Sequence, residues 1–378
     1  ALLGASGGPA AAAESEADLK ARRRSPRPFL YRIEYTDPPT MVPYPEGTER
    51  KVEGVLASQQ LVFLGAHTGS AEDGALAAGI VDRLAARKGK GKLLLGLADV
   101  QQRLQPALDA YLAASDAAAA ELQLRDSGGW AEGAFEGCLP ALRAARARGG
   151  GGVALVALAP DAGALARVAA AGLEGLSADE RNQYVIDLKG FIEFARQTGY
   201  RAYADEVIFP AYADGVARGA FGAEPPSKAN YFAARILRDE AVASAAVEAI
   251  TAAPAGSTMV VLQPAEAVTA APAGSTMVVD LDRVKFGFGS SGRAERIARS
   301  LGGALGVRAV LLNPTAADTL SGTTYLRLAL GLAEDLYDGR PLADFVWYSA
   351  RPLANQLSHL MNADDAGPIW ARIKLGYD

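Results

Sequence analysis

The chain has few of the residues that support metal and thiol chemistry. Its 378 residues include one cysteine, Cys138, and two histidines, His67 and His359. A single cysteine excludes an intramolecular disulfide, and so few cysteines and histidines exclude a structural zinc site built on those ligands. Cys138 is therefore expected to pack as a small hydrophobic residue, not to act as the nucleophile of a thiol protease.

Long apolar runs and a strong net charge are also missing. No stretch of about 18 uninterrupted apolar residues occurs, so the sequence predicts no membrane span, although peripheral membrane association stays open. The chain has 43 acidic and 38 basic residues, which gives a net charge of −5. These charges are spread over both signs, which argues against a nucleic-acid surface. The short basic cluster from Lys20 to Arg24 is expected to be a solvated segment.

The two terminal regions are predicted to be extended arms. Residues 1–55 contain prolines that prevent a continuous helix: Pro26, Pro28, Pro38, Pro39, Pro43 and Pro45. The first residues, Ala1–Glu14, read either as the end of an apolar targeting region with a small-residue cleavage site or as an alanine and glycine linker. Residues 351–378 are predicted to be a loosely patterned tail containing a short helix over 356–361.

The region 56–350 alternates strand and helix patterns and is predicted to be one α/β domain. Apolar runs predict strands over 60–64, 92–97, 153–159, 259–262, 277–281, 307–312 and 343–348, with a further strand over 200–204. Helical spacing predicts helices over 72–87, 100–120, 135–148, 160–171, 188–198, 230–252 and 294–301. Strands separated by helices predict a mainly parallel central sheet flanked by helices.

An 11-residue segment occurs twice with identical sequence, over 251–261 and again over 269–279. One duplication of this size is not a solenoid, which needs several units. One copy is therefore expected to form a strand of the sheet, and the other an extra strand or a loop. The second copy is the predicted core strand, because it leads directly into 283–289.

Five stretches, in order, resemble the ChaN-like haem-binding uptake family, which is related to the TIKI superfamily. The resemblance is to its plastid branch, found in RETICULATA-related plant proteins. The matching stretches are Gly172–Arg181, Leu237–Glu240, Arg283–Gly287, Ala343–Ala350 and Met361–Ala363. The resemblance covers roughly residues 56–365, and it implies a ChaN-like α/β fold.

The resemblance also implies that the superfamily's metal site is degenerate here. Relatives end their first strand in a glycine followed by an acid and a histidine, whereas this chain has Gly65, Ala66 and His67. Asp99 is the acid near the end of the second predicted strand. Asp282 and Arg283 stand where a glycine and a histidine are expected, and arginine neither acts as a base nor binds a metal cation at neutral pH. No metal ligand set and no catalytic residue are therefore predicted.

Haem binding is the other activity that the resemblance implies. Bacterial ChaN-like proteins hold haem through a tyrosinate, and such a bond needs a phenol at the rim of a pocket. Four tyrosines are candidates: Tyr200, Tyr203, Tyr212 and Tyr231. Packing as amphipathic aromatics at the edge of the core is the alternative interpretation. His67 is a further candidate for an axial ligand.

Two polar stretches have a structural and a functional interpretation. Asp239 and Glu240 are adjacent on a predicted helix and point about 100° apart, so they cannot form one carboxylate dyad. A structural role is predicted, with Arg238 or Asp239 tying the helix to its neighbours. The Gly/Ser loop over 286–292 is either a flexible connector or an anion site assisted by Arg293 and Arg296.

The sequence therefore favours a non-enzymatic accessory or scaffold subunit without a required cofactor. Its expected partner is a larger complex, such as a photosystem or a light-harvesting assembly, and its expected location is the chloroplast, in the thylakoid lumen or on the thylakoid surface. A haem- or tetrapyrrole-binding protein is the first alternative, and a residual TIKI-type metal-dependent hydrolase is the second.

Overall fold

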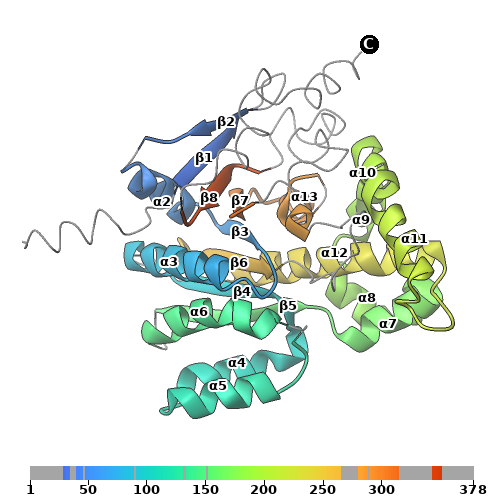
Figure 1. Ribbon diagram of the computed structural model, residues 1–378, viewed down its shortest axis with the longest axis horizontal. Coiled ribbons are helices and arrows are strands. Elements are labelled where there is room, and N and C mark those ends of the chain that lie inside the picture. The colour runs from blue at the N-terminus through green and yellow to red at the C-terminus, as the bar shows by residue number, and fades with distance from the viewer. Residues whose placement is uncertain are drawn as a thin grey trace, which may run out of the picture.

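An eight-stranded mixed sheet forms the centre of the structure, a computed structural model (Figure 1). The structure describes residues 29–34, 40–45, 47–88, 91–130, 133–149, 152–264, 280–287, 289–314 and 343–350. The strands are β1 (Phe29–Glu34), β2 (Thr40–Pro43), β3 (Leu61–Ala66), β4 (Leu93–Gln101), β5 (Val153–Ala159), β6 (Thr258–Pro264), β7 (Val307–Leu312) and β8 (Phe345–Tyr348). Their order across the sheet is β2-β1-β8-β7-β3-β6-β4-β5.

The strands from β8 to β5 are parallel, and the sheet ends in an antiparallel hairpin. β3 pairs with β6 and β7, and β4 pairs with β5 and β6, all in parallel register. β1 pairs antiparallel with both β2 and β8. Every residue of β3 and β4 is buried, as expected for parallel strands covered on both faces. The predicted mainly parallel α/β fold is confirmed.

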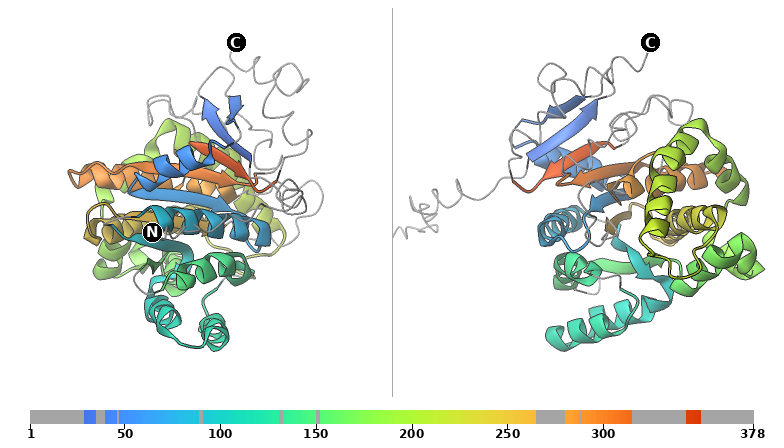
Figure 2. Two further views of the ribbon diagram at one scale, coloured as in Figure 1. Left: turned by 90° about the vertical axis from the view of Figure 1, so that its left-hand side faces the viewer. Right: turned by 45° about the vertical axis from the view of Figure 1, so that its right-hand side comes forward.

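Helices cover both faces of the sheet, as the turned views in Figure 2 show. The α-helices are α2 (Glu49–Ala57), α3 (Ala71–Arg87), α4 (Gln105–Ala113), α5 (Ala117–Asp126), α6 (Ala134–Ala147), α7 (Ala162–Ala171), α8 (Ala178–Tyr184), α9 (Leu188–Arg196), α10 (Thr198–Tyr203), α11 (Phe209–Ala217), α12 (Lys228–Ala252) and α13 (Ser290–Ser300). Short 3-10 turns are η1 (Gln102–Leu104), η2 (Gly172–Gly175) and η4 (Asp280–Val284), and η3 (Ala204–Ile208) is a π-helical turn. No helix in the described ranges is both long enough and apolar enough to span a bilayer.

The alternating side chains of the strands divide the core into two layers. Val62 and Leu64 of β3 pack into one cluster with apolar residues of α2, α3 and α6. Leu61 and Phe63 face the opposite side, where α12, α13 and η4 supply the apolar residues. A third cluster joins α7 to α12, and Figure 1 shows α7 to α11 gathered at one side of the molecule. This arrangement places α12, α13 and η4 together over one face of the sheet.

The second half of the predicted N-terminal arm belongs to the sheet. β1 and β2 form its edge hairpin, and α2 runs through the expected domain boundary at residue 55. The pairing of β1 with β8 joins segments more than 300 residues apart, for which the local sequence has no signal. The first residues of the predicted arm and the predicted tail over 351–378 lie outside the described residues.

Three other element predictions were wrong. The helix predicted over 100–120 is two helices, because β4 continues to Gln101 and Asp116 caps α5 by accepting hydrogen bonds from the Ala118 and Ala119 amides. The strand predicted over 200–204 is helical, with Tyr200 and Tyr203 one turn apart and both buried. The strand predicted over 277–281 gives way to η4 from Asp280, and residues 277–279 lie outside the described part.

The first copy of the repeat supplies a core strand, contrary to the expectation that it would be an extra strand or a loop. The first copy supplies the start of β6, which lies between β3 and β4 in the centre of the sheet. The second copy, which we expected to be the core strand, lies outside the described residues. The long helix α12 ends inside the first copy, at Ala252, and a short turn of the same copy leads from it into β6.

Candidate functional site

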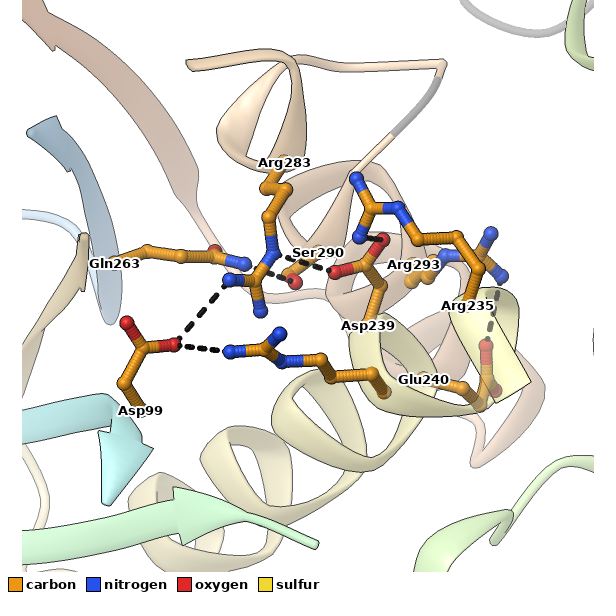
Figure 3. Close-up of polar contacts among 9 residues, drawn as sticks. Asp99, Arg235, Asp239, Glu240, Gln263, Arg283, Ser290 and Arg293 are labelled. Atoms are coloured by element: carbon orange, nitrogen blue, oxygen red, sulfur yellow. Dashed lines mark hydrogen bonds and ion pairs between the residues drawn. The ribbon is translucent and has the colours of Figure 1, made fainter. Parts of the chain in front are cut away.

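The carboxyl ends of β3, β4 and β6 meet α12 and η4, and buried charged side chains gather there. Ligand sites in open α/β sheets lie at this end of the strands. β4 contributes Asp99, α12 contributes Asp239, and η4 contributes Arg283, all of them buried. Figure 3 shows these side chains pointing toward one another from three different elements.

Arg283 lies at the centre of this cluster. Its Nη1 donates to Asp99 Oδ1 at 3.2 Å, and its Nε donates to Asp239 Oδ1 at 3.1 Å. Asp99 Oδ1 also accepts from Arg238 Nη2 at 2.8 Å, and Asp239 Oδ2 accepts from Arg235 Nη1 at 3.1 Å. The guanidinium, which is fully buried, therefore occupies the space between two carboxylates.

Gly65 allows η4 to lie close against β3. A Cβ atom at this position would be 2.6 Å from Val284 Cγ2 and 3.1 Å from Leu281 Cδ2, so a larger residue would force η4 or its side chains to shift. Ala66, the residue in place of the expected acid, is buried with the cluster on the opposite face of β3. The glycine and alanine at the end of β3 thus position η4 and contribute no polar group.

A second set of ion pairs ties α12 to α13. Arg293 Nη1 donates to Glu240 Oε2 at 3.2 Å, and both side chains are fully buried. Arg296 Nη2 donates to Glu240 Oε1, and Arg296 Nη1 donates to Asp187 Oδ2 at 3.1 Å. The Arg293 guanidinium also lies over the Phe194 ring at 4.3 Å from its centroid. This set holds α9, α12 and α13 together.

These contacts bear on the two interpretations left open for the polar stretches. Asp239 bonds to η4 while Glu240 bonds to α13, so the adjacent acids serve different neighbours and the predicted structural role is confirmed. Arg293 and Arg296, the arginines expected to assist an anion at the Gly/Ser loop, both pair with Glu240 instead. Ser290 lies in the first turn of α13, where its Oγ accepts from Gln263 Nε2 at 3.2 Å.

The pKa values of Asp239 and Arg238 are both lowered in this cluster. Burial by itself would raise the pKa of Asp239, but the guanidinium groups of Arg235, Arg283 and Arg293 outweigh it, and the pKa is lowered. Burial, together with the nearby positive charge of Arg283, lowers the pKa of Arg238 to about 10. Both groups are therefore ionised at neutral pH, and neither has a pKa suited to acid or base catalysis there.

His67 belongs to a different network, at the ends of β3, β7 and β8. Its Nδ1 lies 2.7 Å from Asp73 Oδ2, and the same oxygen accepts a hydrogen bond from the His67 amide at 2.7 Å. Asn313 Nδ2 donates to Asp73 Oδ1 at 2.7 Å, and the Ser349 amide donates to Asn313 Oδ1 at 2.8 Å. Asn313 has a φ of 44°, a left-handed conformation that asparagine tolerates. The imidazole is thus oriented by a buried carboxylate.

The three side chains considered as metal ligands are not shown to converge. His67 bonds to Asp73, Asp99 bonds to two arginines, and β6 separates β3 from β4 in the sheet. Asp282 lies in η4, but its side chain is outside the described part. Within the ranges that the structure describes, no group of three or more His, Cys, Asp or Glu side chains is arranged to hold a metal ion.

The candidate tyrosines occupy two kinds of environment. Tyr200 and Tyr203 are buried in the helical cluster and do not lie at a pocket rim as expected. Burial raises the pKa of Tyr200 to about 12 despite the nearby Arg293, so its tyrosinate form is disfavoured. Tyr212 and Tyr231 are half-buried, with ring centroids 5.1 Å apart, and the Tyr212 hydroxyl donates to the Pro226 carbonyl at 2.8 Å.

Sequence reasoning missed the residues that pair with the predicted site residues. Asp73 orients His67, and Arg235 completes the pairing of Asp239. Asp73 lies in the first turn of α3, whose N-cap Ser70 accepts from its amide, so its sequence pattern is that of an ordinary helix start. Cys138 is buried as predicted, and burial raises the pKa of its thiol.

Comparisons with known proteins give two matches. A family model described as "Haem-binding uptake, Tiki superfamily, ChaN" matches residues 53–264, which is more than half of the chain. The structure is also similar to a solved structure of ChaN of Campylobacter jejuni, described as showing cofacial heme binding, with a TM-score of 0.50 and 9% identity over 84% of this chain and 96% of that one. No curated protein matches. At this identity the structural match supports the fold alone.

Proposed function

We propose, from the premise that this chain belongs to the ChaN haem-binding uptake family of the Tiki superfamily, that it is a non-enzymatic accessory or scaffold protein. The observation that carries this proposal is the Arg283 guanidinium, which fills the space between Asp99 and Asp239. A guanidinium stays charged at neutral pH and has no lone pair with which to bind a metal or accept a proton. The cluster therefore functions as a structural junction between the sheet, α12 and η4.

The same contacts argue against residual metal-dependent hydrolysis. A hydrolytic metal centre needs about three protein ligands and an open coordination position. Both oxygens of Asp239 and one oxygen of Asp99 already accept hydrogen bonds from arginines. Any cation at this position would have to displace the covalently attached Arg283.

Peptidase and esterase assays with added Zn²⁺, Mn²⁺ or Co²⁺ test this part of the proposal. We expect no metal-dependent turnover, because the described residues offer no set of three or more ligands for a metal ion. His67→Ala, which removes the one histidine of the described ranges, is the control. Metal-dependent turnover that disappears in His67→Ala would contradict the non-enzymatic assignment.

We further propose that the scaffold acts in the plastid, on a photosynthetic membrane complex in the thylakoid lumen or on the thylakoid surface. The support is the sequence resemblance to the plastid branch of the family. Thylakoid membranes washed with mild detergent and separated by native electrophoresis test this assignment. Migration of the protein with a photosystem or light-harvesting complex is the expected result, and its recovery only outside plastids would refute the location.

Haem or tetrapyrrole binding is a second candidate function, favoured by the geometry of His67. Metal-binding histidines commonly hold one ring nitrogen against a carboxylate, as His67 does with Asp73. The His67 side chain is 29% exposed, whereas Tyr200 and Tyr203 are buried. Of the proposed donors, His67 and the half-buried Tyr212 and Tyr231 are therefore accessible, whereas Tyr200 and Tyr203 are not. Haem bound there would supply an iron centre.

Titration with hemin distinguishes the two candidates. If haem binds through His67, a Soret shift appears at micromolar protein and is lost in His67→Ala. Tyr203→Phe serves as the matched control and leaves the shift unchanged. No Soret shift would remove this candidate function. A shift lost in Tyr203→Phe but kept in His67→Ala would show that Tyr203, and not His67, binds the iron.

A further inference from the structure

A pocket of about 370 Å³ lies at the carboxyl ends of β4 and β5, beside the buried ion-pair cluster. This volume is at the lower end of the range for small-molecule sites. Asp99 and Gln101 of β4 and Arg238 of α12 supply its polar lining, and its apolar lining includes Trp130, Pro160 and Leu165. Apolar pockets with a few convergent polar groups are the usual binding sites of small molecules.

One carboxylate oxygen of the Asp99 side chain has no hydrogen bond. Asp99 Oδ1 accepts from Arg238 Nη2 at 2.8 Å and from Arg283 Nη1 at 3.2 Å, so both guanidinium contacts fall on the same oxygen, as Figure 3 shows. Asp99 Oδ2 is buried and accepts no hydrogen bond from the residues that the structure describes. Buried polar atoms are nearly always hydrogen-bonded, because a buried acceptor without a donor costs its full desolvation penalty. Oδ2 therefore needs a donor that the described residues do not supply.

A neutral group suffices as this donor. The charge of Asp99 is already paired with two guanidinium groups through Oδ1. A cation at Oδ2 would place a further positive group beside those two, whereas a neutral hydroxyl or N–H supplies the hydrogen bond without adding charge. The ligand is therefore expected to be uncharged at the end that contacts Asp99.

Two other polar groups of the lining are engaged within the protein. Gln101 Oε1 accepts from Arg103 Nε at 3.0 Å and from the Ala162 amide at 3.2 Å. The Trp130 indole N–H donates to the Leu124 carbonyl at 3.0 Å. Asp99 Oδ2 is thus the acceptor that these lining side chains leave for a ligand.

The apolar wall is aromatic and held in place from two sides. The Trp130 ring packs edge-on against Phe135, with ring centroids 5.0 Å apart. Gly129 precedes Trp130 with a φ of 85°, and a Cβ there would be 2.9 Å from Gln101 Nε2. The glycine turn therefore brings the loop close to the end of β4 and places the indole at the pocket. A flat apolar body suits this wall.

We propose that this pocket binds a small neutral molecule with a flat apolar body, which donates a hydrogen bond from a hydroxyl or N–H group to Asp99 Oδ2 and packs its body against Trp130. Phenol and benzimidazole are simple members of this class. This inference goes beyond the scaffold role, and it depends neither on that role nor on haem binding. A hydrogen bond to a carboxylate is charge-assisted and stronger than one between neutral groups. The bound molecule satisfies the oxygen of Asp99 that the arginines leave open.

Calorimetric titration of the full chain at neutral pH with phenol and benzimidazole tests the proposal. Anisole and 1-methylbenzimidazole are the matched control ligands, because methylation removes the donor and keeps the ring. We expect saturable binding of phenol and benzimidazole, and at least about tenfold weaker binding of each methylated analogue. No saturable binding of phenol or benzimidazole up to about 10 mM, or equal affinity of each donor and its methylated analogue, would overturn the proposal.

A substitution at Asp99 tests which atom accepts the hydrogen bond. Asp99→Asn can keep its amide oxygen on the two arginines and then places an NH₂ group, which cannot accept, at the Oδ2 position. The variant should therefore bind phenol and anisole with equal affinity. A preference for phenol that survives in folded Asp99→Asn would assign the donor to another acceptor and contradict the proposal.

Two further variants separate loss of the pocket from loss of the fold. Ala162 lines the pocket at the exposed start of α7, so Ala162→Phe should fill the pocket and weaken phenol binding at least tenfold without unfolding the protein. Ala166→Phe, one turn further along the same helix and also exposed, is the matched control and should leave binding unchanged. Equal binding by Ala162→Phe and Ala166→Phe would place the ligand outside this pocket.

Discussion

Replacing Arg283 by methionine tests the structural role assigned to the central guanidinium. Methionine has a similar length and no charge, so Arg283→Met removes two ion pairs of 3.1 and 3.2 Å and creates little cavity. Removing one partner from a buried ion pair costs about 3–5 kcal/mol, because a carboxylate is left without its compensating charge. Asp99 and Asp239 each keep a second arginine, so we expect the lower half of this range, about 3–4 kcal/mol.

Urea unfolding followed by circular dichroism measures this loss, with the free energy extrapolated linearly to water. The matched control is Arg299→Met, which removes an ion pair to Glu295 from an arginine that is 68% exposed. Exposed pairs of this kind contribute about 1 kcal/mol or less. A double-mutant cycle with Asp239→Asn should give a coupling energy of about 1–3 kcal/mol. The reasoning fails if Arg283→Met destabilises the protein no more than Arg299→Met does.

Three further outcomes are expected. Gly65→Ala should cost about 1–3 kcal/mol of unfolding free energy, because the new Cβ would lie 2.6 Å from a methyl group of η4. The control Gly54→Ala places its Cβ in open space and should be neutral or stabilising. Equal effects of the two substitutions in urea unfolding would contradict this prediction. Because the pKa of Asp239 is lowered in the folded state, its carboxylate stabilises the fold fully above about pH 4, the ordinary aspartate pKa, and this stabilisation is lost as the pH falls further. Asp239→Asn should therefore lose less unfolding free energy than the wild type between about pH 4 and pH 2. The exposed-site control Asp109→Asn should lose as much as the wild type. The Cys138 thiol, buried and with a raised pKa, should react with Ellman's reagent only in urea, and rapid reaction of the folded protein would show that the thiol is accessible.

The elements that could be predicted from the sequence are those with strong local patterns. β5 and β7 were predicted with the bounds that the structure gives, because each is a run of apolar residues between clear breaks. The long helix α12 was predicted within two residues of its start, and Ser227 caps it by accepting from the Asn230 amide. These features depend on neighbours in sequence, so a single chain is enough to show them.

The candidate site could be predicted only in part, because its contacts join distant segments. Asp99 and Arg283 were both identified as positions of the ancestral site, but not as partners, although they lie 184 residues apart and bond directly. The pairing of His67 with Asp73 had no signal beyond an ordinary helix start. Tyr200 and Tyr203 were misplaced because residues 200–204 were predicted to form a strand, whereas helical spacing buries both side chains. Local patterns predict secondary structure, whereas side-chain partners follow from the topology.

The Arg283 guanidinium supplies the positive charge that a bound cation would otherwise supply between the two carboxylates. Two buried carboxylates at the end of a sheet need positive charge between them. A metal ion supplies that charge with open coordination positions and can exchange with solvent, whereas a guanidinium on η4 supplies it through N–H groups alone and cannot leave. The positive charge between the two carboxylates is therefore a permanent part of the cluster.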